Sequence, residues 1–384
     1  MSQPVYLVIP STGVGGMEKR LVEVWLRLTP HHAGLHLVVS QQTHAALLAR
    51  PDLGDLVALA DRVILFDPGS GRFPAMMRAL IGVTRRLPRG ATVHYLLNAP
   101  PLIDRLLGHR MILSWVANFS PRPGRTRAAN TIWLAARAAF HSAHRLDVLT
   151  PGVADDLRRS ALLAPRISVT AGGSFADFDH FRPAPAKRDD VVFLGRTEAG
   201  KNALAFVQAI PLVAARLAAA GRSTRFLVYG APAGQEAEIA RLLASDAYRG
   251  IAVERGHTVD PAAILAPAKV FVSLQVPSNY PSKALVEAMG CGCVPVINAS
   301  GESRLMADDA LASFIPSAFT PEQLADAVAD ILLLDEAAFA ERSRATREQA
   351  ISRFRIERQV EYFASLWRLE EAALRLPNPS RAGG

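Results

Sequence analysis

The chain has 384 residues, of which half are apolar and a fifth are charged, with a formal net charge of +8. One hydrophobic core rarely serves so long a chain, so we expect two domains, and the composition excludes a disordered protein. No apolar run is long enough to span a bilayer and the first ten residues lack the features of a signal peptide, so we expect a cytoplasmic protein.

The positive charge lies in the N-terminal half. Residues 1–185 contain 21 Lys and Arg against 12 Asp and Glu, whereas the remainder contains 22 against 23. Nucleic acid, anionic lipid and phosphorylated substrates are all attracted by such a field, so charge alone does not identify the partner. The two cysteines, Cys291 and Cys293, are too few for zinc and too close for an ordinary disulfide, and we expect both to be reduced.

In chain order, the first half alternates short β-branched runs with longer amphipathic stretches. The expected strands are 5–10, 36–40, 62–66, 91–97, 110–116 and 145–150. Between the first two, apolar residues from Met17 to Leu28 recur on one helical face. This rhythm predicts parallel strands connected by helices.

Residues 178–190 interrupt the rhythm with prolines and mixed charge, which is typical of a linker. We therefore expect an N-terminal domain over 1–185 and a C-terminal domain over 186–353. The rhythm resumes with expected strands at 191–195, 225–230, 251–254, 269–274 and 293–297. Residues 354–376 predict one amphipathic helix that packs across both domains, and residues 377–384 a frayed tail.

Three junctions that follow strands carry the chemistry, because parallel sheets bind ligands at the carboxyl ends of their strands. The first is the glycine-rich segment Ser11–Gly16, whose backbone N–H groups could meet an anion or a sugar at a helix start. It is not a dinucleotide fingerprint, since Glu18 stands where the third glycine belongs. A tight turn without a ligand is the alternative.

The second junction, Gly195–Asn202, nearly spells a phosphate-binding Walker loop. Asn202 stands where a hydroxyl residue should ligate Mg²⁺, which argues against an ATPase or kinase. Arg196 and Lys201 remain as two cations that could clamp a diphosphate. A surface loop with two solvated cations is the alternative.

The third junction is Pro277–Gly290, in which a helix begins near Pro281 with Ser278 or Asn279 as its cap. The N-terminus of that helix is an anion site. Glu287 lies in an otherwise apolar helical run, where a carboxylate needs a partner. A ribose diol would serve, and so would neighbouring backbone or an Arg.

At these residues the chain resembles the retaining GT-B glycosyltransferases of family four. The similarity covers nearly the whole chain in order: the glycine-rich loop, the strand followed by Gly-Arg and Lys-Asn, and the helix ending in EAMGCGCVPVI. Residues 173–183 also resemble the stretch before the second domain of these enzymes. The resemblance implies an α/β fold of two doubly wound Rossmann-like domains that face a cleft, with a C-terminal helix crossing both.

The resemblance also implies roles for particular residues. Glu287 would bind ribose. The first Glu of the family's motif, which contacts the donor sugar, is here Asn279 with Ser278 beside it, an uncharged substitution. The residues that would hold the donor diphosphate are Arg196, Lys201, Gly15, Gly16, Ser282 and Lys283.

The family's mid-domain His is not securely placed in this chain. His94 and Asn118 are weak substitutes for a catalytic residue, and His94 lies within an expected strand, which favours a core histidine. No acidic pair at a strand end suggests a metal, so the expected enzyme needs no metal and no cofactor.

The expected function is transfer of a sugar, with retention, from a nucleoside-diphosphate sugar to a glycan or lipid-linked intermediate of cell-surface polysaccharide synthesis. Nucleic acid is not an expected partner. The basic N-terminal domain suggests peripheral contact with the inner face of an anionic membrane, through an amphipathic helix over Phe73–Arg89. A non-catalytic nucleotide-sugar-binding protein and a GT-B-fold nucleotide-sugar epimerase are the alternatives.

Overall fold

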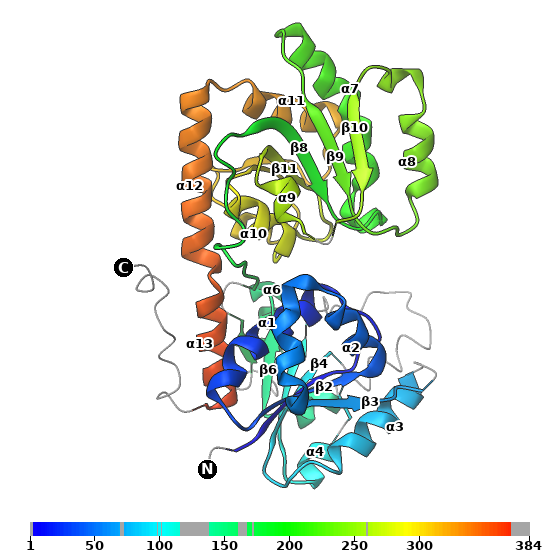
Figure 1. Ribbon diagram of the computed structural model, residues 1–384, viewed down its shortest axis with the longest axis vertical. Coiled ribbons are helices and arrows are strands. Elements are labelled where there is room, and N and C mark those ends of the chain that lie inside the picture. The colour runs from blue at the N-terminus through cyan, green and yellow to red at the C-terminus, as the bar shows by residue number, and fades with distance from the viewer. Residues whose placement is uncertain are drawn as a thin grey trace. The chain divides into compact units, whose positions relative to one another are not determined.

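The computed structural model describes residues 3–69, 73–97, 99–100, 102–115, 138–159, 167–170, 173–258 and 260–369. It divides into two compact units (Figure 1). The N-terminal unit comprises residues 1–173 together with 357–384, and the C-terminal unit comprises residues 174–356.

The N-terminal unit contains a parallel sheet of seven strands in the order β3-β2-β1-β4-β5-β6-β7. From β1 the chain adds β2 and β3 on one side of β1, and it then crosses to add β4 and the later strands on the other side, as in doubly wound folds. The strands are β1 (Val5–Ile9), β2 (Leu35–Ser40), β3 (Val63–Phe66), β4 (Thr92–Leu96), β5 (Arg110–Trp115), β6 (Arg145–Val148) and β7 (Ile167–Val169).

Helices cover this sheet because the strands are apolar on both faces, as buried parallel strands are. Met76 and Leu80 of one helix pack with Tyr95 and Leu113 in one such core. The helices of the unit are α1 (Gly16–Leu28), α2 (Gln41–Leu48), α3 (Phe73–Thr84), α4 (Ile103–Leu106), α6 (Pro151–Arg158) and α13 (Ile356–Trp367), whose first residue still belongs to the C-terminal unit.

The C-terminal unit contains a parallel sheet of six strands in the order β10-β9-β8-β11-β12-β13. The strands are β8 (Arg188–Leu194), β9 (Arg225–Tyr229), β10 (Ala252–Gly256), β11 (Ala268–Ser273), β12 (Val294–Asn298) and β13 (Ser313–Ile315). The helices are α7 (Ala203–Ala219), α8 (Glu236–Leu243), α9 (Ala262–Leu265), α10 (Lys283–Gly290), α11 (Pro321–Leu332) and α12 (Glu336–Phe354).

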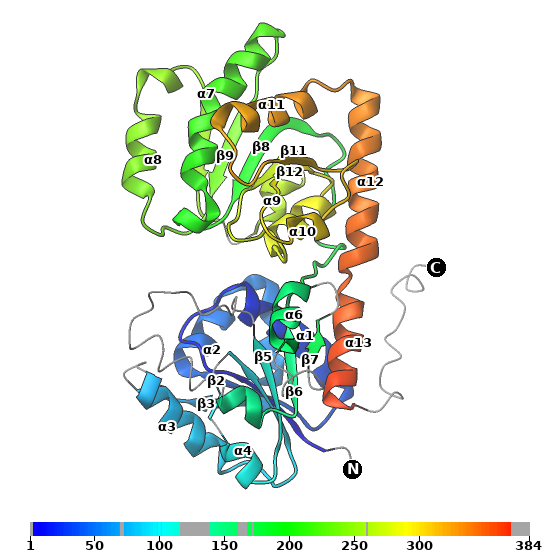
Figure 2. The same cartoon turned by 180° about the vertical axis from the view of Figure 1, so that it is seen from behind.

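Alternate residues of the central strands of the C-terminal unit point to two separate cores. Phe193 and Val272 face α7, α8 and α11, whereas Val192 and Phe271 face α9, α10 and α12. Figure 2 shows α12 running along one side of this unit. The predicted α/β class, with two doubly wound sheets, is confirmed.

The unit boundary falls at 173/174, before the proline-rich segment that the sequence suggested as a linker. That segment is packed onto the C-terminal unit, where the Arg347 guanidinium donates to the carbonyls of Phe178 and Phe181 at 3.0 and 2.7 Å. Proline and mixed charge prevent regular structure, but they do not prevent packing. The β8 strand then begins within the segment, at Arg188.

Of the single helix expected over 354–376, residues 356–367 form α13, which begins after Arg355 and ends at Trp367. Arg355 separates α12 from α13 with extended backbone angles (φ −67°, ψ 141°). The chain leaves the helix there because Ala176 pairs with it, its N–H donating to the Phe354 carbonyl at 3.2 Å. The expected residues 370–376 lie outside the described part.

The apolar side of α3 is turned to its own unit. Met76 and Leu80 are buried in the core and Val83 is packed against it, whereas Arg78 and Arg85 are exposed. An amphipathic pattern is thus explained by burial against the sheet. Among the described helices none has both the length and the apolarity to cross a membrane.

Candidate functional site

The strand order of the C-terminal sheet reverses between β8 and β11, where open α/β sheets bind ligands at the carboxyl ends of strands. The loops that follow these two strands, 195–202 and 274–282, are joined here. Val276 N–H donates to the Gly200 carbonyl at 2.9 Å, and Asn202 Nδ2 donates to the Leu274 carbonyl at 2.7 Å. Asn202 adopts the left-handed conformation (φ 55°), which Asn tolerates better than most residues. In this structure its amide joins two loops, unlike a Walker hydroxyl that ligates a metal.

The loop after β9 approaches the loop after β8 so closely that backbone meets backbone. A Cβ on Gly230 would lie 1.8 Å from the Gly195 carbonyl oxygen. Gly195 N–H in turn donates to the Tyr229 carbonyl at 2.9 Å. Only glycine fits at 230, because any side chain would overlap the neighbouring chain.

The two predicted cations belong to the loop after β8. Arg196 is 63% exposed, and its Nη2 lies 3.0 Å from Glu198 Oε1. Lys201 is more enclosed, and its Nζ donates to Gln275 Oε1. Burial lowers the pKa of Lys201; the Arg196 charge lowers it further, while Glu198 opposes the shift. Two nearby cations repel each other, and an anion that binds between them removes this repulsion, so its binding is strongly favoured.

Gln275 connects this loop to the start of α10. While its Oε1 accepts from Lys201, its Nε2 donates to Ser282 Oγ at 2.8 Å. Ser282 is the N-cap of α10, and its Oγ accepts from Leu285 N–H at 3.3 Å. A continuous chain of hydrogen bonds therefore joins Lys201 to a helix N-terminus. The sequence analysis missed Gln275, although it is the first polar residue after the strand expected at 269–274.

The next residues of α10 are Lys283 and Glu287, one helical turn apart. Lys283 Nζ lies 3.9 Å from Glu287 Oε1, donates to the Phe175 carbonyl at 3.3 Å and stands 4.5 Å from the centroid of the Phe175 ring. Glu287 is 5% exposed. The buried carboxylate of Glu287 thus has the Lys283 ammonium beside it. This resembles the alternative given in the sequence analysis, in which a protein group satisfies Glu287.

Asn279 is a fully buried support of the loop after β11. Its Oδ1 accepts from Ser273 Oγ at 2.7 Å and from Gln275 N–H at 2.9 Å. Its Nδ2 donates to the Asn298 carbonyl and to Ser303 Oγ, both at 3.0 Å. Both ends of the amide are occupied and the residue is 0% exposed, so the position holds the loop rather than facing solvent. Ser278 beside it is partly exposed, and its Oγ accepts from Tyr280 N–H at 3.0 Å.

Gly15 and Gly16 follow β1 and begin α1 in the N-terminal unit. Gly15 N–H donates to Glu18 Oε2 at 2.9 Å, so the carboxylate of the first turn satisfies it. Nothing would meet a Cβ on Gly16 within 4 Å. The loop is held at Ser11, whose carbonyl accepts from Ser40 Oγ at 2.9 Å.

His94 lies in the core of the N-terminal unit. Its Nδ1 accepts from Trp367 Nε1 at 2.9 Å, and its Nε2 lies 2.7 Å from Ser114 Oγ. The residue is 0% exposed, and burial lowers its pKa to about 4. It is a satisfied core histidine, the interpretation that the sequence favoured, and it is not placed to act as a catalytic base. Asn118, the other weak candidate, lies outside the described residues.

The same core contains a buried carboxylate, Asp147. It accepts from Ser114 Oγ at 2.5 Å, from Tyr362 Oη at 2.8 Å and from Thr170 Oγ1. We call His94, Ser114, Asp147, Thr170, Tyr362 and Trp367 the buried polar network. Across the part of the chain that the structure describes, no three His, Cys, Asp or Glu side chains lie close enough together to hold a metal ion.

Comparison with known proteins gives a family match within the C-terminal unit. A family model described as glycosyl transferases group 1 matches residues 188–333, which include the loops after β8, β9 and β11. No curated protein sequence matches the chain significantly.

Solved structures resemble the whole chain at low identity. They include Anabaena Alr3699/HepE in complex with UDP and glucose, at 13% identity and TM-score 0.73, covering 96% of this chain and 100% of that one. A glycosyltransferase from Rickettsia africae has 11% identity and TM-score 0.69, with coverage of 98% and 100%. Sucrose-phosphate synthase from Thermosynechococcus elongatus has 18% identity and TM-score 0.69, with coverage of 97% and 100%. At such identities these likenesses establish the fold, which is GT-B.

Proposed function

We propose that this chain, a GT-B protein whose residues 188–333 belong to the glycosyl transferases group 1 family, transfers a sugar from a nucleoside-diphosphate sugar to a carbohydrate acceptor with retention. The donor diphosphate binds at the carboxyl edge of β8 and β11. Arg196 and Lys201 supply its positive charge, and the N-terminus of α10 supplies further N–H groups.

The observation that carries this proposal is the hydrogen-bonded chain from Lys201 through Gln275 to Ser282. It fixes a half-enclosed ammonium beside a helix N-terminus at the switch point of the sheet. Both features favour the leaving diphosphate as its charge develops, which is electrostatic stabilisation by groups already in position. Because these cations can do what a divalent ion would do, we propose that transfer needs no metal, and chelation should leave turnover unchanged.

The experiment begins with the nucleotide. A thermal-shift series with UDP, GDP, ADP and CMP identifies the base, since a ligand at 100 times its Kd stabilises a fold by about 2.7 kcal/mol. UDP comes first because the Anabaena structure contains it. The matching nucleotide sugars are then tested for release of nucleoside diphosphate.

Lys201→Ala and Arg196→Ala should each weaken binding of that nucleoside diphosphate by about 1.5–3 kcal/mol, the range for hydrogen bonds to charged groups. Melting without ligand should change little. Arg249→Ala is the matched control, because Arg249 is 82% exposed on another loop of the same unit. Parent-like nucleotide affinity in both loop variants would refute the diphosphate assignment.

We further propose that the Glu287 carboxylate binds the ribose hydroxyls of the donor. Its burial beside the start of α10 and the sequence resemblance support this assignment. Glu287→Gln should lose affinity for the ordinary nucleotide and bind its 2′,3′-dideoxy analogue almost as the parent does. An equal loss for both nucleotides would assign Glu287 to its pairing with Lys283 alone.

For the acceptor we propose a glycan or a lipid-linked intermediate of cell-surface polysaccharide synthesis, reached at the inner face of an anionic membrane. The support is the basic N-terminal half and the exposed arginines 78, 85, 86 and 89 on and after α3. Each such residue contributes on the order of 1 kcal/mol near an anionic surface. Co-sedimentation with anionic liposomes should therefore fall with salt and with all four changed to Gln. Equal pelleting of both proteins would indicate that the acceptor is soluble and not bound to a membrane.

A non-catalytic nucleotide-sugar-binding protein is the second candidate. It is favoured by the position of His94, whose two ring nitrogens are both engaged in the core. Slow hydrolysis of the bound donor by the pure protein would exclude it. The anomeric configuration of the released or transferred sugar then tests retention, and a product epimerised without any acceptor would indicate an epimerase.

A further inference from the structure

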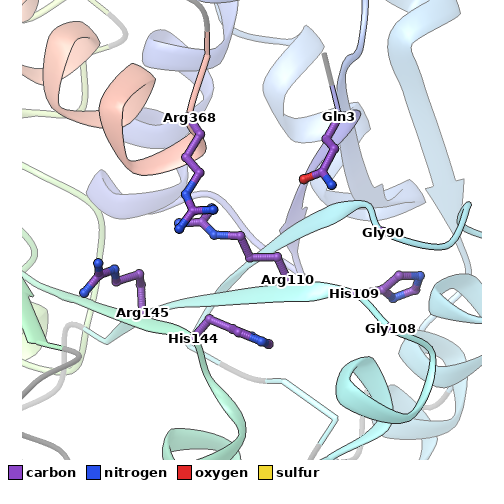
Figure 3. Close-up of a pocket in the computed structure, with 8 residues that line it drawn as sticks. All are labelled: Gln3, Gly90, Gly108, His109, Arg110, His144, Arg145 and Arg368. Atoms are coloured by element: carbon purple, nitrogen blue, oxygen red, sulfur yellow. The ribbon is translucent and has the colours of Figure 1, made fainter. Parts of the chain in front are cut away.

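The N-terminal unit contains a cavity of about 480 Å³ at the edge of its sheet opposite to the carboxyl ends (Figure 3). β5 starts at Arg110 and β6 starts at Arg145, so these arginines mark the amino ends of two adjacent strands. Arg368 follows the last residue of α13 and completes the lining with Gln3, His109 and His144. No part of the proposed donor site takes part in this cavity.

Among the described residues, the lining contains three arginines and two histidines and no acidic residue. In Figure 3 the side chains of Arg110 and Arg368 point toward each other. Arg110 Nη1 and His109 Nε2 are buried and have no hydrogen-bond partner among the described residues. Buried polar atoms without a partner are rare in folded proteins, and each usually indicates a water, an ion or a ligand.

Arg368 also ends α13. It has φ 58°, its N–H donates to the Ser365 carbonyl at 3.1 Å, and Leu369 N–H donates to the Ala364 carbonyl at 2.9 Å. These are the hydrogen bonds of a Schellman helix end. The helix end therefore fixes the backbone position of Arg368 beside the cavity.

The electrostatics agree with the geometry. Burial lowers the pKa of Arg110 to about 10, and the charges of Arg368 and Arg145 contribute to the shift. The carboxylate of Asp104 lies beside one lining histidine, with its Oδ1 3.1 Å from His109 Nδ1, on the ring edge away from the unpartnered Nε2. The guanidinium groups therefore destabilise each other, and a bound anion would remove that repulsion.

We propose that this cavity is an anion site for a phosphate-class ligand, distinct from the donor site. A monocarboxylate would balance one of the charges of Arg110 and Arg368, whereas a phosphoryl or pyrophosphoryl group carries two or more. Its oxygens also match the fork of a guanidinium, which binds such groups with two parallel hydrogen bonds.

Pyrophosphate is the probe, titrated by calorimetry at 150 mM salt into the full chain. The parent should bind it, and Arg110→Gln with Arg368→Gln should bind at least tenfold more weakly. Arg249→Gln is the control, an arginine 82% exposed in the other unit, and should bind like the parent. Equal affinity of the parent and the double variant would overturn the proposal.

The donor site could also take pyrophosphate, so the titration is repeated with Lys201→Ala. Binding at the arginine cavity should persist in Lys201→Ala and disappear in the double variant, whatever becomes of the proposed transfer activity. The double variant should melt at or above the parent temperature without ligand, because it loses like-charge repulsion. If it does not fold, Arg368→Lys keeps the charge without the fork and should still weaken binding several-fold.

Two further arms identify the source of the anion. Co-sedimentation with phosphatidylglycerol vesicles that depends on Arg110 and Arg368 would assign a lipid headgroup. Binding of pyrophosphate alone, without vesicle binding, would assign a soluble phosphorylated ligand. In the sequence, Leu369, Glu370 and Glu371 follow Arg368. A parent that binds nothing, while Glu370→Gln with Glu371→Gln binds pyrophosphate, would show that the chain supplies its own counter-charge and would overturn the proposal.

Discussion

Two polar clusters of this molecule have similar chemistry and opposite surroundings. The buried polar network of the N-terminal unit joins six side chains through hydroxyl, imidazole, indole and carboxylate groups, and its His94 has no exposed surface. The loop cluster of the C-terminal unit joins Lys201, Gln275 and Ser282, and Arg196 of the same loop is 63% exposed.

The difference teaches which polar groups are available for ligands. In the buried polar network the described side chains form hydrogen bonds with other protein groups, so removing a member should lower stability. In the loop cluster a charged end remains open to solvent, so removing a member should lower affinity. A variant of the buried polar network that changes only affinity, or a variant of the loop cluster that changes only stability, would contradict this comparison.

The largest expected effect is on stability, at Asp147. Asp147→Ala leaves the hydroxyls of Ser114, Thr170 and Tyr362 buried without their acceptor, and each unsatisfied group costs about 1–3 kcal/mol. We expect the free energy of unfolding to fall by about 3–5 kcal/mol in urea denaturation, and by less for Asp147→Asn. Asp155→Ala is the control, since that carboxylate is 63% exposed in the same unit. Equal losses for the two alanine variants would contradict the network.

Gln275 tests the loop cluster. Gln275→Glu would hold Lys201 in an ion pair and place a negative charge beside the proposed diphosphate, so nucleoside-diphosphate affinity should fall by roughly 2 kcal/mol. The unliganded melting temperature should stay level or rise. Gln208→Glu on the exposed surface of α7 is the matched control. A loss of stability with unchanged affinity would make Gln275 a structural residue like those of the buried polar network.

The smallest expected effect is the pH dependence that His94 contributes. Its folded pKa is about 4, below the ordinary histidine value of 6.5, because burial disfavours the charged ring. The unfolded chain therefore binds more protons than the folded chain between these values, and stability falls as pH falls. From pH 7 to 5.5 this contribution is about 1 kcal/mol.

The measurement compares urea denaturation of the parent and of His94→Gln at both pH values. The variant should lose less stability on acidification than the parent, because it lacks the group that gains a proton on unfolding. The same loss in both proteins would place the pH dependence elsewhere.

The central strands were predictable because buried parallel strands are apolar runs that glycine, proline or polar residues bound. β7 (Ile167–Val169) and β13 (Ser313–Ile315) were missed, since three residues carry almost no periodic signal. The break at Arg355 was equally invisible, because it depends on pairing with Ala176, far away in sequence.

The candidate site divides in the same way. Arg196 and Lys201 stood out because they follow a strand directly, which is a local signal. The burial of Asn279 depends on Asn298 and Ser303, which belong to the next strand and its loop, so no local pattern could reveal it. Gln275 had a local signal, since it is the first polar residue after β11.

The way α13 enters the N-terminal unit sets an order for biosynthesis. Residues 174–356 form one uninterrupted unit, whereas the unit that begins the chain also needs residues from 357 onward. Until those residues leave the ribosome, His94 and Asp147 lack Trp367 and Tyr362. At about 5–20 residues per second, roughly ten seconds or more separate synthesis of residue 173 from that of Trp367. The first half to be translated is therefore the last to be completed.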